Sequence, residues 1–386
     1  MTNFEFSMAT TVVYGLGVAE NLGEHCKRFN ATKVFFITDK YMAEKSPITP
    51  VLLQSIKDAG LEVMVYSDVL PDPHIELVDS AAKILKEFNA DLVVALGGGS
   101  PMDTAKALCL LARNEGSIAE YMHKRKVADA DGIPLICLPT TAGTGSEVTT
   151  GTVITDRQSE EKIGVNHPSM RPKMAIIDPN LQMSMPPSLT AATGMDALCH
   201  AIEAYVSTKA DPMSDAMNLH AIKLIGENLR TAVANGKDVE ARGNMAIASL
   251  MAGIGFAQAG LGLVHGIAHC LGAMYHVPHG VANALMLPFV MEFNMIGNMK
   301  KYKNIAEALG IDVRNMTDRE GAKKAVEAVF QLKKDLDIPR SLEQVGVRES
   351  DIATIVKNSI TYRMLPCNPR TVTEKDIETI LMKALV

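Results

Sequence analysis

From residue 30 to residue 180, short apolar runs alternate with longer segments in which apolar residues recur every three or four positions. The short runs are rich in β-branched residues and predict strands at residues 33–39, 61–67, 90–97, 133–141 and 174–179. The longer segments have helical spacing and predict helices at residues 50–60, 74–89 and 101–114. Strands separated by helices indicate a mostly parallel sheet that helices cover on both faces.

The second half of the chain has a different pattern of apolar residues. Beyond Pro186 and Pro187 the strand signal disappears, and an Ala-, Met- and Leu-rich helical pattern continues almost to Val386. A chain of 386 residues also exceeds the ~250–300 residues at which a single hydrophobic core stops growing. We therefore predict an α/β domain over residues 1–185, an all-α domain over residues 186–386, and a ligand site in the cleft between them.

Charge and composition argue against several classes of partner. The net charge is −6 and there is no basic tract, which argues against nucleic acid or an anionic membrane surface as the main partner. No apolar stretch approaches the ~18 residues that span a bilayer, and the first residues lack the basic and apolar regions of a signal peptide. The six cysteines include no C-x-x-C pair, so we expect reduced thiols in a cytoplasmic enzyme.

Half of the ten histidines fall in two segments of the predicted helical domain. In the first segment, Asp196 and His200 are four residues apart and share one face of a helix. The second segment supplies four more histidines within fifteen residues: His265, His269, His276 and His279. One carboxylate with three imidazoles suits Zn(II), Fe(II) or another first-row metal, which can polarise an oxygen substrate as a Lewis acid. The clustering predicts a metal site rather than a set of ordinary buried or capping histidines.

A triple-glycine turn at residues 97–99 follows the predicted strand at residues 90–97. Without Cβ atoms, this backbone can approach a ligand closely. Ser100 is expected as the N-cap of the next helix, with Pro101 at its first position and Asp103 completing an S-x-x-D capping box. The free N–H groups at such a helix start favour a pyrophosphate.

A second turn of this kind, at residues 139–151, also follows a predicted strand and carries hydroxyls at Thr140, Thr141, Thr144 and Ser146. Two such turns predict a phosphate-containing ligand. The usual dinucleotide fingerprint is absent, because the candidate ribose-binding acid, Asp39, precedes the glycines instead of following them by about 20 residues. A carboxylate at this position would repel a 2′-phosphate and favours NAD over NADP. No Walker A lysine follows the glycines, which weighs against an ATPase or kinase.

Four segments closely resemble motifs of the iron-containing (group III) alcohol dehydrogenases: GGGSPMDTAK, PTTAGTGSEVT, TAATGMDALCHAIEAY and GLGLVHGIAHCLGAMYHVPHGVANALMLP. That family includes lactaldehyde reductases, 1,3-propanediol dehydrogenases, butanol dehydrogenases and Bacillus-type methanol dehydrogenases. The resemblance runs over essentially the whole chain, down to NPR at residues 368–370. It implies an α/β domain that binds NAD(P) and an all-α domain that holds the metal, in an architecture related to that of dehydroquinate synthase.

The resemblance also implies roles for individual residues. The metal ligands are expected to be Asp196, His200, His265 and His279, and His269 is expected to be a non-ligand histidine that relays protons beside the substrate. His276 is expected in the wall of the site, although its spacing alone would also allow a ligand role. Glu203, one turn after His200 on the same helix face, is expected beside the ligands. With the turn residues, the candidate NAD(H)-binding positions are Asp39, Asp72, Gly97, Gly98, Gly99, Ser100, Asp103, Thr140, Thr141, Thr144, Thr149 and Lys162. One divalent metal per chain is expected, and Fe(II) is favoured over Zn(II) by the resemblance alone.

The expected reaction is the interconversion of a short-chain primary alcohol or diol and its aldehyde, catalysed by a homodimer or a higher homo-oligomer. Substrate contacts are expected from Gly151, Phe256, His276 and Arg363. Gly151 stands where some diol reductases of the family carry Asn, which implies a roomier pocket.

Two alternatives remain open. Arg363 could pair with the carboxylate or sulfonate of an anionic aldehyde such as succinic semialdehyde or sulfoacetaldehyde, or it could be a solvent-facing or helix-packing arginine. A metal-dependent lyase of the dehydroquinate-synthase type, or an NAD-binding sensor without enzymatic activity, would also fit parts of the pattern. Net production of NADH from an alcohol distinguishes the dehydrogenase from both.

Overall fold

The computed structural model describes residues 3–159 and 161–386, which form two compact units. The sheet unit comprises residues 8–141 and 146–184. The helical unit comprises residues 185–386, the N-terminal segment that ends at Ser7, and the short segment 142–145. The two short segments therefore group with the helices, although the sequence around each of them belongs to the sheet unit.

The sheet unit is built on six parallel strands in the order β1-β8-β5-β4-β2-β3. The predicted fold class, a parallel α/β sheet followed by an all-α region, is confirmed, and each of the five predicted strands is present. The strands are β1 (Thr11–Tyr14), β2 (Lys33–Asp39), β3 (Glu62–Val69), β4 (Leu92–Gly97), β5 (Leu135–Pro139) and β8 (Met174–Ile177).

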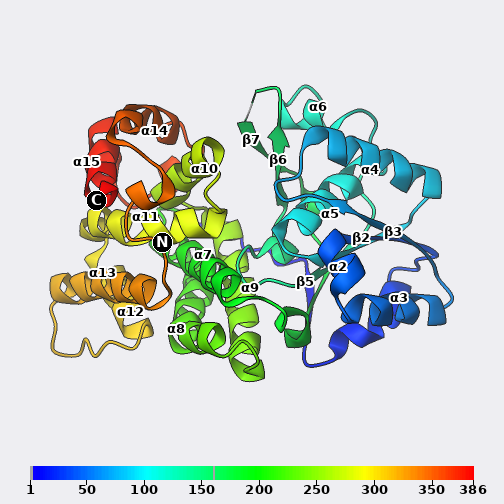
Figure 1. Cartoon of the computed structure of the whole chain (residues 1–386), viewed down its shortest axis with the longest axis horizontal. Helices are drawn as coiled ribbons and strands as arrows, with labels where there is room; N and C mark the ends of the chain where they lie inside the picture. The colour runs from blue at the N-terminus through cyan, green and yellow to red at the C-terminus, as the bar shows by residue number, and fades with distance from the viewer. Residues whose placement is uncertain (1–2, 160) are drawn as a thin grey trace. The chain divides into compact units, whose positions relative to one another are not determined.

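Helices cover both faces of this sheet, as Figure 1 shows. They are α1 (Leu22–Lys27), α2 (Lys40–Lys45), α3 (Ile48–Asp58), α4 (Ile75–Phe88), α5 (Gly99–Leu111) and α6 (Ile118–Met122). Alternate residues of β2 belong to two hydrophobic cores, one on each face of the sheet. Phe35 and Ile37 pack with α4 and α5, whereas Val34 and Phe36 pack with α1 and α3. Because both faces of a strand are buried, the central strands read as continuous apolar runs.

Three strands were not predicted. β1 has only four residues and lies at the edge of the sheet. β6 (Gly151–Asp156) and β7 (Glu161–Asn166) form a separate antiparallel pair. In β6, buried positions alternate with exposed or half-buried ones, so the strand lacks the continuous apolar run that marks the central strands. β6 begins at Gly151, the last residue of the predicted hydroxyl-rich turn.

No strand follows Ile177 within the described part of the chain, in agreement with the loss of the strand signal. The helices of the helical unit are α7 (Pro187–Val206), α8 (Pro212–Ala234), α9 (Val239–Ala259), α10 (Leu263–Tyr275), α11 (His279–Asn294), α12 (Met299–Ala308), α13 (Asp318–Asp335), α14 (Ile352–Ser359) and α15 (Glu374–Leu385). They share one hydrophobic core, within which α11 packs against α7, α10, α13 and α15 (Figure 1).

One segment, His279–Gly297, is long and apolar enough by composition to cross a membrane, contrary to the expectation that no stretch would be. Its most apolar window has a mean hydropathy of 1.2 and is 56% buried inside the protein. α9 and α10 are long and apolar enough to cross a membrane only if they are counted as one helix, and they are bent by 106° at the break between them. The burial and contacts of His279–Gly297 are those of a core helix of the helical unit.

Candidate metal centre and cofactor site

Helix α7 and the first turns of α10 and α11 bring four potential metal ligands together. Asp196 and His200 lie on α7, His265 lies in the first turn of α10, and His279 is the first residue of α11. One ligand atom from each residue lies within 4.8 Å of the others. Three of the four side chains are buried, whereas the side chain of His279 is 42% exposed and leaves the cluster open on its side.

The imidazoles of His200 and His265 are held in defined orientations. Nδ1 of His200 lies 3.1 Å from the carbonyl oxygen of Gly143, in the segment that follows β5. The ring of His200 stacks on Phe256 at 4.5 Å and on His265 at 4.7 Å between ring centroids. Burial lowers the pKa of both histidines, that of His265 strongly. The neutral imidazole is the form that binds a metal.

Glu203, one turn after His200 on α7, fixes the orientation of His265. Its Oε2 lies 2.5 Å from Nδ1 of His265, and its Oε1 accepts a 2.8 Å hydrogen bond from the backbone N–H of Val264. Burial raises the pKa of Glu203 to about 8. With Nδ1 engaged by the carboxyl group, Nε2 of His265 faces the cluster. A carboxylate behind a ligating histidine is a common feature of metal sites.

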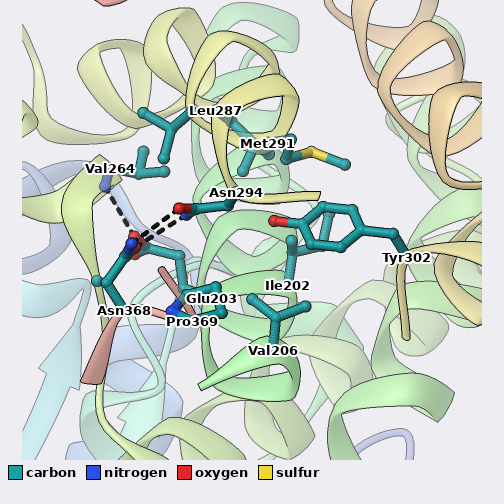
Figure 2. A pocket seen from close by; sticks show the side chains of 12 residues that line it. Ile202, Glu203, Val206, Val264, Leu287, Met291, Asn294, Tyr302, Asn368 and Pro369 are labelled. Carbon is teal, nitrogen blue, oxygen red and sulfur yellow. Dashed lines mark hydrogen bonds between the residues drawn. The ribbon is translucent and has the colours of Figure 1, made fainter. Parts of the chain in front are cut away.

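A pair of asparagines, Asn294 and Asn368, also supports the start of α10 (Figure 2). Oδ1 of Asn368 accepts a hydrogen bond from the backbone N–H of Leu263, and the amides of Asn368 and Asn294 bond each other at 2.8 and 2.9 Å. Together with Glu203, they line a small buried pocket. Two side chains thus satisfy the N–H groups of two consecutive residues at the start of α10, where a helix has no carbonyl partners of its own.

Asn283 is a further member of the cluster that the sequence analysis missed. It is fully buried one turn after His279, and its Nδ2 donates to Oδ1 of Asp196 at 2.7 Å. The same nitrogen lies 3.1 Å from Nε2 of His265 and 3.0 Å from Nε2 of His279. The four-residue spacing after His279 in HGVAN was the available signal, since residues at this spacing share a helix face.

The other histidines of the segment lie in different environments. His269 is half-buried beside the cluster, with its ring centroid 5.5 Å from that of His279 and 5.3 Å from that of Tyr362. His276 is exposed, ends α10 in a left-handed conformation, and is not part of the ligand cluster. Arg363 is exposed and adjoins Tyr362; it forms no ion pair with a carboxylate of the described residues.

The donor set of this cluster fits a first-row divalent metal. Three imidazole nitrogens and one carboxylate oxygen are ligands that Fe(II) and Zn(II) both accept. Hydrogen bonds behind His200 and His265 orient their rings, as in proteins that bind such ions. The helical unit therefore offers a coherent metal site built entirely from its own residues.

Three of the candidate cofactor residues lie at the carboxyl ends of strands of the parallel sheet. Asp39 ends β2, Gly97 ends β4, and Thr140 directly follows β5, so all three lie at the carboxyl ends of neighbouring strands. In open α/β sheets, ligands bind at this edge. Gly97 has a φ of +152°, and a Cβ atom there would lie 2.5 Å from Pro101. The turn into α5 therefore requires glycine.

The predicted cap of the helix after this turn is wrong. α5 begins at Gly99 with Gly98 as its N-cap, and no side chain caps it, so Ser100 is already inside the first turn. Asp103 does not form a capping box with Ser100. Its carboxylate instead accepts hydrogen bonds from Ser146 Oγ at 2.7 Å and from the backbone N–H of Val153 at 2.9 Å. A contact from a distant segment has replaced the local one, and no side chain occupies the backbone N–H groups at the helix start.

Lys106 holds the hydroxyl-rich loop in place, a role that the sequence analysis did not assign. The lysine is fully buried on α5, and burial lowers its pKa. Its Nζ donates to Ser146 Oγ at 2.7 Å, to Thr149 Oγ1 at 2.8 Å and to the carbonyl oxygen of Gly151 at 2.9 Å. A lysine within the apolar run of α5 was the available signal, because buried lysines are rare unless they are paired.

The remaining candidates fall into three places. Lys162 of β7 forms a 2.6 Å ion pair with Asp72, so these two predicted cofactor residues contact each other. Gly151 begins β6 in the sheet unit. Thr144 belongs to the segment that groups with the helical unit, whereas the other candidate cofactor residues belong to the sheet unit.

Comparisons with known proteins agree on one family. The family model for iron-containing alcohol dehydrogenases matches residues 9–179, and the model for the C-terminal part of the Fe-containing alcohol dehydrogenase family matches residues 190–385. The chain is 40% identical to an NAD-dependent methanol dehydrogenase of Bacillus methanolicus over 385 residues, which is 100% of each chain.

Solved structures give the same result. A structure of 1,3-propanediol oxidoreductase superimposes with a TM-score of 0.96 at 36% identity and 100% coverage of both chains. A sulfoacetaldehyde reductase from Bifidobacterium kashiwanohense in complex with NAD+ superimposes with a TM-score of 0.92 at 30% identity, covering 100% of this chain and 99% of that one.

Proposed function

Because the chain belongs to the iron-containing alcohol dehydrogenase family, we propose that it interconverts a short-chain primary alcohol or diol and its aldehyde, with NAD(H) as cofactor and one divalent metal ion per chain. The observation that carries this proposal is the group of four potential ligand atoms within 4.8 Å of one another. Methanol and 1,3-propanediol appear in the names of close relatives, and both are small primary alcohols.

Asp196, His200, His265 and His279 would hold the metal, and Fe(II) is the ion we favour on the strength of the family. When bound, such an ion supplies Lewis-acid polarisation of an alcohol or carbonyl oxygen. Glu203 keeps Nδ1 of His265 engaged and its Nε2 available. The exposed side of His279 gives the substrate access to the cluster.

NAD(H) would bind at the carboxyl edge of the parallel sheet. The start of α5, which no side chain caps, would present its backbone N–H groups to the pyrophosphate. Asp39 would accept hydrogen bonds from the adenosine ribose. The nicotinamide supplies the hydride acceptor when it is bound.

His269 is our candidate for the proton relay. It is half-buried, and its ring lies beside that of His279, so it adjoins both the cluster and solvent. A histidine in this position can exchange a proton with the reacting hydroxyl group and pass it to solvent.

We also propose that the protein is a cytoplasmic enzyme that assembles as a homo-oligomer. The edge strand β1 supports an assembly, since it pairs only with β8 among the described strands and is followed by the exposed Leu16.

The test of this function is a panel of alcohols and aldehydes assayed by NADH absorbance after anaerobic loading with Fe(II). Reduction of NAD+ with a small primary alcohol, or oxidation of NADH with its aldehyde, is the expected result. Turnover of no member of the panel, by protein shown to contain the metal, would contradict the proposal. A product formed without net change in NADH would favour the lyase alternative.

An anionic aldehyde is the second candidate substrate, and it rests on Arg363. The guanidinium is exposed, has no carboxylate partner among the described residues, and adjoins Tyr362, which packs edge-on against His269. A sulfonate or carboxylate in the substrate could form a bidentate pair with it. The relative that reduces sulfoacetaldehyde is a more distant one, so we rank this substrate class second.

Arg363→Ala separates the two substrate classes. If the guanidinium binds the substrate, the variant should lose about 1.5–3 kcal/mol in kcat/KM with a sulfonated or carboxylated aldehyde, the size of a hydrogen bond to a charged group. Propanal should be affected much less. Arg314→Ala is the control, because Arg314 pairs with Asp312 at an exposed site. Equal effects of Arg363→Ala on charged and neutral aldehydes would identify Arg363 as structural.

Lys106→Met should weaken NADH binding. The variant removes three hydrogen bonds that hold Ser146, Thr149 and Gly151, and hydrogen bonds from a charged donor are worth about 1.5–3 kcal/mol each. We expect the Kd for NADH, measured by its fluorescence, to rise about 10-fold or more. Lys333→Met is the matched control, since Lys333 is also buried but lies on α13 of the helical unit. An unchanged Kd in folded Lys106→Met protein would contradict this role.

A further inference from the structure

The two ends of the Asn283 side-chain amide differ in their hydrogen-bonding partners. The side chain is fully buried, and its Nδ2 lies within 3.1 Å of one atom each from Asp196, His265 and His279. Its Oδ1, by contrast, has no hydrogen-bond partner among the described residues. Buried polar atoms without partners are uncommon and call for an explanation.

The present orientation of the amide follows from the lone pairs around it. The NH2 group faces one carboxylate oxygen and two imidazole nitrogens, all of which can accept hydrogen bonds. With Oδ1 in its place, the carbonyl oxygen would face the same lone pairs and be repelled. This orientation leaves Oδ1 buried without a hydrogen-bond partner among the described residues, which is unfavourable in free energy.

A divalent ion held by the cluster would reverse this preference. It would take up the lone pairs of Asp196, His265 and His279 that the NH2 group now faces. The positive ends of two N–H bonds would then lie close to a dication, while the negative carbonyl oxygen would point away from it. A turn of the amide about its Cβ–Cγ bond exchanges the two ends without moving α11.

We propose that Asn283 is a fifth residue of the metal site, and that its amide turns on metal binding so that Oδ1 faces the ion. This inference rests on the proposed function, since it requires that the cluster binds a divalent metal. Asn283 lies one turn after His279 on the same face of α11, so the helix that supplies a ligand also supplies this oxygen. An additional oxygen beside the ligands suits ions such as Fe(II) or Co(II) better than Zn(II), which is satisfied by four.

The test measures metal affinity rather than turnover. Apo-protein is titrated with Co(II) in competition with a chelator, and the visible d–d absorption of Co(II) reports changes in coordination. Asn283→Leu keeps the approximate shape but has neither amide end, whereas Asn283→Asp presents only oxygen. Asn228→Leu is the control, because Asn228 is a half-buried asparagine on α8 that donates to the carbonyl oxygen of Leu224.

We expect Asn283→Leu to weaken Co(II) binding about 10–100-fold, the usual effect of removing a group that supports the ligands. Asn283→Asp should bind Co(II) at least as tightly as the wild-type protein and alter the d–d spectrum. The control should match the wild type. Far-UV circular dichroism checks that each variant is folded, and Asn283→Asp decides the question by itself if the leucine variant does not fold.

Two results would overturn this inference and leave the metal site standing. One is wild-type affinity in folded Asn283→Leu. The other is a loss of Co(II) affinity of about 10-fold or more in Asn283→Asp, which would show that the N–H groups, and not the oxygen, support the ligands. A wild-type protein that binds no divalent ion would instead contradict the proposed metal function, and the inference about Asn283 with it.

Discussion

His265→Ala is expected to abolish both metal retention and alcohol oxidation. His265 is fully buried, supplies one of the four clustered ligand atoms, and is oriented by Glu203. Its removal leaves three donors and takes away the imidazole partner of the buried Oε2 of Glu203. Lewis-acid stabilisation of the reacting oxygen is worth several kcal/mol. We therefore expect kcat/KM to fall by about 10³-fold or more, since each 1.36 kcal/mol corresponds to a factor of ten.

The measurement combines metal analysis with kinetics. Protein purified without oxygen should contain about one divalent ion per chain in the wild type, as expected for a single site with four donors, and much less in the variant. His220→Ala is the control, because His220 is an exposed histidine on α8. Full activity of metal-free His265→Ala protein would refute the proposed role of the cluster.

Asp39→Gly is expected to narrow or invert a preference for NADH over NADPH. The proposal places the adenosine ribose beside this carboxylate, so that a 2′-phosphate would be repelled. Two such charges at about 4 Å interact by about 1–4 kcal/mol, depending on how far water screens them. Since Asp39 is only half-buried, we take the lower part of this range and expect the ratio of kcat/KM values to shift about 10-fold or more.

A second variant separates the charge from the structural role of Asp39. Its Oδ1 accepts a 2.9 Å hydrogen bond from the backbone N–H of Met42 and so caps α2. Asp39→Asn retains an acceptor for this cap and removes only the charge. It should shift the cofactor preference in the same direction as Asp39→Gly with a smaller loss of thermal stability. Better use of NADPH than NADH by the wild-type protein would show that Asp39 has a different role.

The sequence determined the fold class because the signals for it are local. Apolar runs such as that of β2 are long enough to mark strands buried on both faces, and the helices between them have clear periodicity. Asp196 and His200 could be placed on one helix face by their spacing alone. The family could be identified because its motifs are continuous segments of sequence.

Only the tertiary structure determined which distant groups satisfy one another. Asp103 looked like part of a capping box, but Ser146 and Val153, more than forty residues away, use its carboxylate. Lys106 ends the motif GGGSPMDTAK, but nothing near it in sequence indicated a role. Its hydrogen-bond acceptors come from the loop after β5. The antiparallel pair β6–β7 escaped prediction because its strands, with half-exposed positions, lack the apolar run of a central strand.

Around the candidate metal site, too, the sequence indicated the chemistry and the tertiary structure determined the partners. The spacing of the histidines indicated a metal site, but not which imidazoles come together, because that depends on how α7, α10 and α11 pack. Glu203, Asn283 and Asn368 have amide or carboxyl side chains of ordinary types. The partners that place them at this site, His265, His279 and Leu263, lie 62, 4 and 105 residues away in sequence. Local periodicity specifies which face of an element is buried. The pairing of buried polar groups is decided only when the elements pack, since each must find its partner there or remain unsatisfied.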